Sequence, residues 1–301
     1  MYEMNPLGKS DLQVSPVSFG CMSLGENPVL YKDLLRRAVE SGINYFDTAD
    51  LYQKGLNELY VGETLKPIRK NVIIATKAGN QWRPDGSGWD WNPSKEYILK
   101  CAEKSLRRLK TDYIDLYQLH GGTIDDPIDE TIEAFELLKQ QGKIRWYGIS
   151  SIRPNVIREY IKRSNIVSVM MQYSLLDHRP EEEILDLLHQ HDISVICRGA
   201  VAQGFLLSKP ADNYLQYTDG EVARAAKMLA KVAAESERTK LEVALGYIWA
   251  HPAVATAALG VRTSAQLDEA ILALRHAAPL SDMQRMALRQ SVRSFHYEAH
   301  R

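Results

Sequence analysis

The sequence has little net charge and no long hydrophobic run, and these absences exclude several classes of protein. Its 301 residues include 37 basic and 38 acidic side chains, which leave a formal charge of −1. No segment approaches the ~18 consecutive apolar residues that a membrane-spanning helix needs. Residues 1–16 lack the charged and then apolar layout of a secretory signal. We therefore predict a cytoplasmic protein that binds neither nucleic acid nor membrane.

Cysteine is scarce, and the histidines are not grouped. The three cysteines, Cys21, Cys101 and Cys197, lie far apart and form no C-x-x-C, and their odd number cannot all pair. This usage is typical of buried, reduced thiols. His189 and His191 are two residues apart near the end of a predicted helix and do not share a face. We predict that the protein has no metal site.

The sequence also lacks a glycine-rich phosphate loop. Neither G-x-G-x-x-G nor G-x-x-x-x-G-K-[ST] occurs in it. This absence argues against a doubly wound open sheet, which is the alternative fold for a chain that alternates between strands and helices.

What the sequence does contain is an alternation of short apolar runs with longer amphipathic segments. Continuous apolar runs indicate strands buried on both faces of a parallel sheet, predicted over residues 17–21, 43–46, 72–76, 113–119, 144–149, 166–172, 193–197 and 256–261. Helices are predicted over residues 31–41, 56–65, 93–109, 128–140, 153–163, 181–191, 221–236, 241–250, 264–274 and 281–294.

Eight strands, each followed by helical sequence, predict an α/β fold of the (β/α)8 TIM barrel type. Residues 7–15 are expected to form an N-terminal hairpin that plugs the barrel floor, and residues 281–294 an extra C-terminal helix. No linker or repeat divides the chain, so we predict a single domain over residues 1–301.

Four reactive side chains come at the ends of consecutive predicted strands. Asp47 and Tyr52 follow the second strand, Lys77 the third and His120 the fourth. In a barrel these carboxyl ends meet at one mouth, where catalytic groups lie. Each residue alone has an ordinary structural role, as a cap, a solvated charge or a core phenol. The occurrence of four such residues at the ends of consecutive strands favours a catalytic role.

That chemistry is proton transfer to an oxygen. A free tyrosine has a pKa of ~10 and is a weak acid at neutral pH. We expect the Lys77 ammonium to lower the pKa of Tyr52, and Asp47 to keep Lys77 charged. His120 would hydrogen-bond a substrate carbonyl. The set predicts a general acid with support for a developing oxyanion.

Four stretches of the sequence resemble motifs of the aldo-keto reductase family, and the resemblance runs over essentially the whole chain. They are G-x-x-x-FDTA-x-x-Y at residues 42–52, IIATK at 73–77, DYIDLYQLHGG at 112–122 and GKIRWYGISS at 142–151. The resemblance implies a catalytic tetrad of Asp47, Tyr52, Lys77 and His120. It also implies that NADPH binds before a small-molecule carbonyl substrate.

The resemblance further implies a cofactor site at the later strands. Ser150 and Ser151 stand where the family has Ser-Asn at the nicotinamide carboxamide. If the family motif is aligned on the tyrosine that follows this strand, the glutamine that the family has at the cofactor site corresponds to Met170. Gln172 lies two residues on, on the same face of the strand, and can take its place. Alternatively, Gln172 only forms hydrogen bonds with backbone groups of a neighbouring loop.

Two other segments resemble parts of the family that bind the rest of the cofactor. Residues 197–209 resemble the segment that wraps the pyrophosphate, with Arg198 where many members have an aromatic residue, and with Gly199, Gly204 and Leu206. Residues 259–270 resemble the adenosine motif, which implies Arg262 and Gln266 at the 2′-phosphate and Glu269 at the adenine. An arginine–phosphate pair favours NADP(H) over NAD(H).

The substrate pocket is predicted from residues 78–93, a long loop after the third strand that is rich in glycine and tryptophan. Long loops in compact domains are commonly functional. Trp82, Trp89 and Trp91 are expected to wall an apolar pocket, although at least one of them can simply pack on the barrel rim. We expect a monomer or a weak homo-oligomer.

Three functions are compatible with a barrel of this kind. Carbonyl reduction with NADPH is favoured by the complete tetrad. A regulatory subunit of the same fold that senses NADPH need not keep all four groups. A metal-dependent hydrolase would need clustered ligands at strand ends, where only His120 and Asp47 are candidates.

Overall fold

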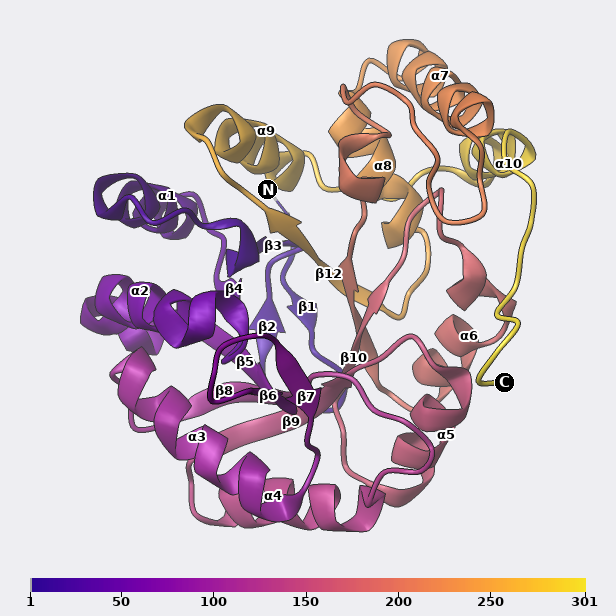
Figure 1. Cartoon of the computed structure of the whole chain (residues 1–301). Helices are drawn as coiled ribbons and strands as arrows, with labels where there is room; N and C mark the ends of the chain where they lie inside the picture. The colour runs from indigo at the N-terminus through magenta and orange to yellow at the C-terminus, as the bar shows by residue number, and fades with distance from the viewer. Residues whose placement is uncertain (1) are drawn as a thin grey trace.

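The computed structural model describes residues 2–301 and shows a closed barrel of eight parallel strands (Figure 1). Around the barrel the strands follow the order β10-β11-β12-β3-β4-β5-β8-β9. Their bounds are β3 Val17–Gly20, β4 Tyr45–Asp47, β5 Ile73–Ala78, β8 Ile114–Leu119, β9 Ile144–Ser150, β10 Ser168–Gln172, β11 Ser194–Arg198 and β12 Val254–Gly260. Every predicted strand overlaps one of these, so the predicted (β/α)8 barrel is confirmed.

Helices surround the barrel and connect its strands, as Figure 1 shows. They are α1 Pro28–Glu40, α2 Leu56–Leu65, α3 Lys95–Leu109, α4 Ile128–Gln140, α5 Pro154–Arg163, α6 Ile184–Gln190, α7 Asp219–Glu235, α8 Lys240–Trp249, α9 Ser264–Arg275 and α10 Asp282–Gln290. The extra C-terminal helix is α10, and the tail after Gln290 runs beside α6 toward α5 (yellow in Figure 1).

The first helix begins three residues before its predicted start, and local capping explains the difference. The side chain of Asn27 accepts hydrogen bonds from the backbone N–H groups of Val29 and Leu30, and Pro28 occupies the first helical position. A capping asparagine followed by proline is a strong start signal. In the opposite direction, the terminal helix is shorter than predicted and ends at Gln290 rather than at residue 294.

The predicted N-terminal plug is present as a hairpin of β1 (Asn5–Pro6) and β2 (Gln13–Val14). Leu7, Leu12 and Val14 are buried and pack against barrel-lining side chains of β4, β5, β8, β10, β11 and β12. The Asn5 side chain donates a hydrogen bond of 2.7 Å to the Ala255 carbonyl. The hairpin therefore closes one end of the barrel with apolar side chains.

Residues 78–93 were predicted to form a loop, and this prediction is wrong in one respect, because the segment contains a second hairpin. β6 (Asn80–Trp82) pairs antiparallel with β7 (Trp89–Trp91), and Trp82 lies opposite Trp89. Alternating aromatic residues and a Gly-containing turn at residues 83–88 stabilise such a pair. Hydrogen bonds between the two strands thus give this segment a defined shape at the barrel mouth.

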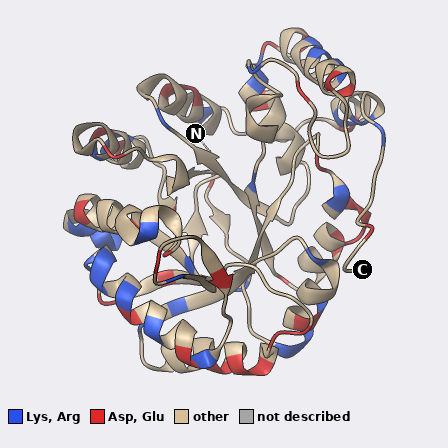
Figure 2. Cartoon of the chain, viewed as in Figure 1, with Lys and Arg blue, Asp and Glu red and all other residues tan. Residues whose placement is uncertain are grey.

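Charges of both signs alternate over the outer helices in Figure 2, and the barrel strands carry few of them. Among residues 2–301, no helix combines the length and apolarity needed to cross a bilayer.

Candidate active site

The structure brings the four predicted catalytic residues to one end of the barrel. Asp47 is the last residue of β4, Lys77 is the next-to-last of β5, and His120 follows β8 directly. Tyr52 begins a short 3-10 turn after β4. Because all three strands are parallel and adjacent, these side chains meet at their common carboxyl end.

Lys77 and Asp47 form a buried ion pair at the centre of this group. The Lys77 Nζ lies 2.5 Å from Asp47 Oδ2 and donates a second hydrogen bond of 2.8 Å to the Thr48 carbonyl. The Lys77 side chain is only 1% exposed. Burial alone would lower the pKa of Lys77, but the charges of Asp47 and Tyr52 raise it above its usual value. Lys77 is therefore charged at neutral pH.

Tyr52 lies next to this ammonium, with its ring centroid 5.2 Å from Lys77 Nζ. Burial raises the pKa of the Tyr52 hydroxyl above 10, and the charge of and a hydrogen bond with Lys77 lower it only in part. Lys77 thus lowers the pKa of Tyr52 as predicted, but desolvation outweighs the ammonium, and the expected net decrease is wrong. Tyr52 carries its proton at neutral pH, as a general acid must.

His120 completes the group and packs against Tyr52. The two rings meet edge to face with centroids 5.8 Å apart. Burial, together with the charges of Lys77 and Arg198, lowers the pKa of His120 to about 3. The His120 Nδ1 is buried and has no hydrogen-bond partner in the described chain. His120 is thus a neutral imidazole at neutral pH.

The turn that carries Tyr52 has an unusual backbone. Gln53 and Lys54 have φ angles of 50° and 55°, and Gly55 follows at 90°. Left-handed conformations are unfavourable for side chains with a Cβ and persist where surrounding contacts hold them. The Gln53 amide donates 3.1 Å to the Leu24 carbonyl and accepts 3.1 Å from Asn57, which fixes the turn.

Gln118 is a member of this site that the sequence prediction missed. It is fully buried, pairs with Lys77 in the register of β5 and β8, and its Nε2 lies 3.4 Å from Asp47 Oδ1. Gln118 is two residues before His120, so strand alternation places the two on the same inward face. That alternation was the signal that could have identified it.

The predicted cofactor residues of the later strands also lie at this end. Ser150, Gln172 and Arg198 end β9, β10 and β11, and Ser151 follows β9. The Arg198 Nη1 donates 3.0 Å to Gln172 Oε1. The charge of Arg198 helps to lower the pKa of His120 and opposes the increase in the pKa of Tyr52.

After β11 the chain turns tightly around two glycines. Gly199 and Gly204 have φ angles of 70° and 93°, which only glycine adopts easily. A Cβ on Gly199 would also lie 3.2 Å from the Gln172 side chain. Leu206, also predicted at the cofactor site, is fully buried, and its backbone N–H donates to the Val201 carbonyl.

Arg262, Gln266 and Glu269 are exposed and lie together around the start of α9. The Gln266 Oε1 accepts a 2.8 Å hydrogen bond from the Arg262 backbone N–H, and Thr263 caps the helix. The N-terminus of a capped helix next to an arginine favours an anion.

Comparison with known proteins agrees with this geometry. A family model described as the aldo/keto reductase family matches residues 16–293. The chain belongs to the aldo/keto reductase family. Members of this family are oxidoreductases that use nicotinamide cofactors.

Individual aldo/keto reductases are similar to this chain over most of its length. It is 53% identical over 304 residues to the uncharacterized oxidoreductase YqkF of Bacillus subtilis, with 98% of each chain covered. It is 33% identical over 230 residues to an NADH-specific methylglyoxal reductase of Escherichia coli, covering 70% of this chain and 71% of that one. The holo structure of aldo-keto reductase AKR11C1 from Bacillus halodurans superposes with a TM-score of 0.93 at 50% identity and 99% coverage of each chain.

In this aldo/keto reductase, Trp82 contacts residues on both sides of Tyr52 in the chain. Its Nε1 donates 3.2 Å to the Leu51 carbonyl, and the Lys54 ammonium lies 5.1 Å from the centroid of its ring. Trp89, opposite it in the hairpin, is 49% exposed. These contacts make Trp82 a candidate wall of the substrate pocket.

Trp91 has a structural role on the barrel rim. Its Nε1 donates 2.8 Å to Asp126 Oδ1, and its ring packs so closely on Gly79 that a Cβ there would come within 2.6 Å. Trp91 therefore holds the hairpin against the loop after β8, as expected for at least one of the three tryptophans.

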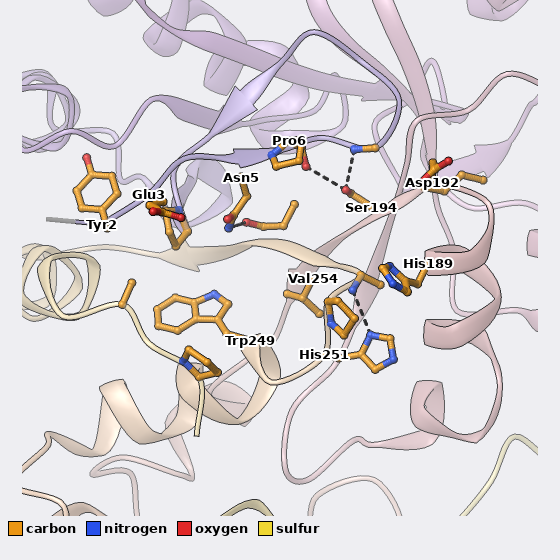
Figure 3. Close-up of a pocket in the computed structure, with 18 of the residues that line it drawn as sticks. Tyr2, Glu3, Asn5, Pro6, His189, Asp192, Ser194, Trp249, His251 and Val254 are labelled. Atoms are coloured by element: carbon orange, nitrogen blue, oxygen red, sulfur yellow. Dashed lines mark hydrogen bonds between the residues drawn. The ribbon is translucent and has the colours of Figure 1, made fainter. Parts of the chain in front are cut away.

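A cavity of about 630 Å³ lies at the opposite end of the barrel (Figure 3). It is bounded by Ser194 and Val254, the first residues of β11 and β12, and by Trp249 of α8. The Ser194 hydroxyl accepts 2.7 Å from the Gly8 N–H and donates 3.2 Å to the Pro6 carbonyl. These polar groups attach the hairpin to the barrel floor, where contacts serve stability.

Proposed function

We propose that this aldo/keto reductase reduces aldehydes and ketones to alcohols with hydride from NADPH, and that Tyr52 is the general acid. The observation that carries the proposal is the buried Lys77–Asp47 pair beside Tyr52 at the barrel mouth. Two adjacent strands, β4 and β5, hold this pair, so its geometry is preorganised.

Each of the four side chains has its own role in the reaction of the substrate carbonyl. Tyr52 gives its proton to the oxygen as negative charge develops there, and the Lys77 ammonium stabilises the resulting phenolate. Asp47 keeps Lys77 charged and in place. Neutral His120 carries one ring N–H, which can donate to the carbonyl oxygen and orient it.

The residues at the later strands fit a dinucleotide. Arg198 and Arg262 make the hydrogen bonds described above but pair with no carboxylate within residues 2–301. Two unpaired guanidiniums and the N-terminus of α9 supply positive potential where phosphates would bind. When bound, the cofactor supplies the hydride. Arg262 supports a 2′-phosphate and hence NADPH over NADH.

The test is turnover of the purified protein together with direct cofactor titration. We expect consumption of NADPH in the presence of 4-nitrobenzaldehyde or methylglyoxal, and weaker activity with NADH. Tight NADPH binding without turnover across a broad aldehyde panel would contradict the proposal and indicate a regulatory protein that senses NADPH. Equal or better use of NADH would contradict the role of Arg262.

In residues 2–301 no group of three or more His, Cys, Asp or Glu side chains could hold a metal ion. The proposed reaction needs none. Activity is therefore expected to survive exhaustive chelation, and its loss would favour a metal-dependent hydrolase.

A further inference from the structure

A row of polar side chains connects the C-terminal tail to the barrel mouth. It runs from Arg179 through Asp177 and Gln172 to Arg198, which ends β11. Gln172 and Arg198 belong to the proposed cofactor site, whereas Asp177 and Arg179 have had no role so far. Asp177 is fully buried, so its charge requires compensation from its neighbours.

Every polar atom at the centre of the row has a defined partner. Arg179 binds Asp177 with both ends of its guanidinium, Nε to Oδ1 at 2.7 Å and Nη2 to Oδ2 at 2.9 Å. The Gln172 Nε2 donates 2.9 Å to the same Oδ2 and 3.1 Å to the Tyr214 hydroxyl. Its Oε1 is thereby turned toward Arg198, from which it accepts 3.0 Å.

This pattern fixes the orientation of the Gln172 amide. Asp177 only accepts hydrogen bonds and so requires the NH2 end of Gln172, which leaves the carbonyl end for Arg198. Without Asp177 the amide could turn over and present donors to the guanidinium. The position of the exposed Arg198 side chain therefore depends on a residue that it does not touch.

The C-terminal tail covers the other end of the row. The Arg179 guanidinium lies 5.4 Å from the Phe295 ring centroid and 4.7 Å from that of Tyr297. Both aromatic residues are buried. Further on, the His300 carbonyl accepts 2.8 Å from the Asn155 N–H at the start of α5. The tail thus holds Arg179 between aromatic rings and Asp177.

We propose that Asp177 and Arg179 are positioning residues which hold Gln172 and Arg198 for the dinucleotide, so that the C-terminal tail is part of the cofactor site. The inference rests on the proposed function, because it assumes that Arg198 contacts the cofactor. It predicts that changes remote from the mouth alter cofactor affinity through Arg198.

The test is a double-mutant cycle of Arg179→Met and Arg198→Met, read as the Kd for NADPH and as the separate changes in KM and kcat. Arg198→Met is expected to raise Kd about tenfold, as for one lost charge-assisted hydrogen bond of ~1.4 kcal/mol. Arg179→Met is expected to raise the Kd for NADPH nearly as much. It should also raise the KM for NADPH and leave kcat unchanged. The double variant should bind no more weakly than Arg198→Met alone, because both changes remove one interaction.

The matched control is Arg69→Met. Arg69 also stacks on an aromatic ring, that of Tyr113 at 4.0 Å, and pairs with a buried carboxylate, that of Asp115, but it lies outside the tail and has no contact with Gln172. We expect it to leave Kd unchanged. Arg179→Lys should recover part of the affinity, since it keeps the charge but not the two-pronged contact. If Arg179→Met does not fold, Tyr297→Leu tests the same link from the tail and should raise Kd about threefold.

The outcomes separate this inference from the proposed function. If Arg198→Met weakens NADPH binding and Arg179→Met does not, or if their effects simply multiply, the positioning role is wrong and the proposed function stands. If Arg198→Met leaves Kd unchanged, the cofactor role of Arg198 fails and the positioning role fails with it. A wild-type protein that binds no NADPH would overturn the proposed function itself.

Discussion

Asp50 lies between Asp47 and Tyr52 in the chain, and its replacement by asparagine should remove a pH dependence of folding stability. The side chain is 9% exposed, and its Oδ1 is buried without a hydrogen-bond partner in the described chain. Burial, followed by the neighbouring Glu58 charge, raises the pKa of Asp50 from 3.8 to about 7. A hydrogen bond with Cys101 and the charge of Arg108 oppose this increase.

The sign and the size of the effect follow from this pKa. Above pH 3.8 the unfolded chain loses the Asp50 proton while the folded protein keeps it until about pH 7. Stability therefore falls as pH rises through this window, by ~1.4 kcal/mol for each pH unit. Between about pH 5.5 and pH 8, ionisation of Asp50 should lower the free energy of unfolding by about 2 kcal/mol. Over the whole window between the two pKa values the decrease should be near 4 kcal/mol.

The assay is urea unfolding of the wild type and of Asp50→Asn at both pH values. Between the two pH values, the unfolding free energy of the variant should fall by about 2 kcal/mol less than that of the wild type. Asp125→Asn is the matched control, because Asp125 is exposed and should leave the pH dependence unchanged. An Asp50→Asn protein with the full wild-type pH slope would refute the reasoning.

Three further predictions test other parts of the structure. Because the pKa of His120 is lowered to about 3, kcat/KM should show no histidine ionisation between about pH 5 and 7, and an acid limb near pH 6.5 that disappears in His120→Gln would contradict this. Arg262→Gln should raise the KM for NADPH at least about tenfold and leave that for NADH unchanged, while an equal increase for both cofactors would rule out a 2′-phosphate contact. Leu12→Ala in the floor hairpin should lower the unfolding free energy by about 2–5 kcal/mol with little change in kcat/KM, and a selective loss of activity would show that floor and mouth are coupled.

The fold could be predicted from the sequence because local patterns and overall topology agree. Continuous apolar runs identified all eight barrel strands, and the strand-end rule placed Asp47, Lys77 and His120 at one mouth. The boundaries were less certain, since the Asn27 cap moves one helix start and a hairpin forms where a loop was predicted. The single domain, the cytoplasmic location and the oligomeric state stay predictions.

The energetics of the site could not be read from the sequence. The pKa of Tyr52 depends on the balance of burial against one ammonium, and residue types alone do not give the degree of burial. The row from Arg179 to Arg198 joins residues of the chain with the C-terminal tail, and no spacing rule connects Asp177 to Tyr297. Such long-range contacts become visible only in three dimensions.

The most direct test of the central claim is the single-turnover rate of Tyr52→Phe with saturating NADPH and 4-nitrobenzaldehyde. Tyr60→Phe is the control, since the Tyr60 ring stacks on Tyr31 outside the tetrad. If Tyr52 supplies the proton, its variant binds NADPH normally but reduces the aldehyde at least about a hundredfold more slowly, while Tyr60→Phe keeps its rate. A Tyr52→Phe protein that reduces the aldehyde at a near-normal rate would contradict the account.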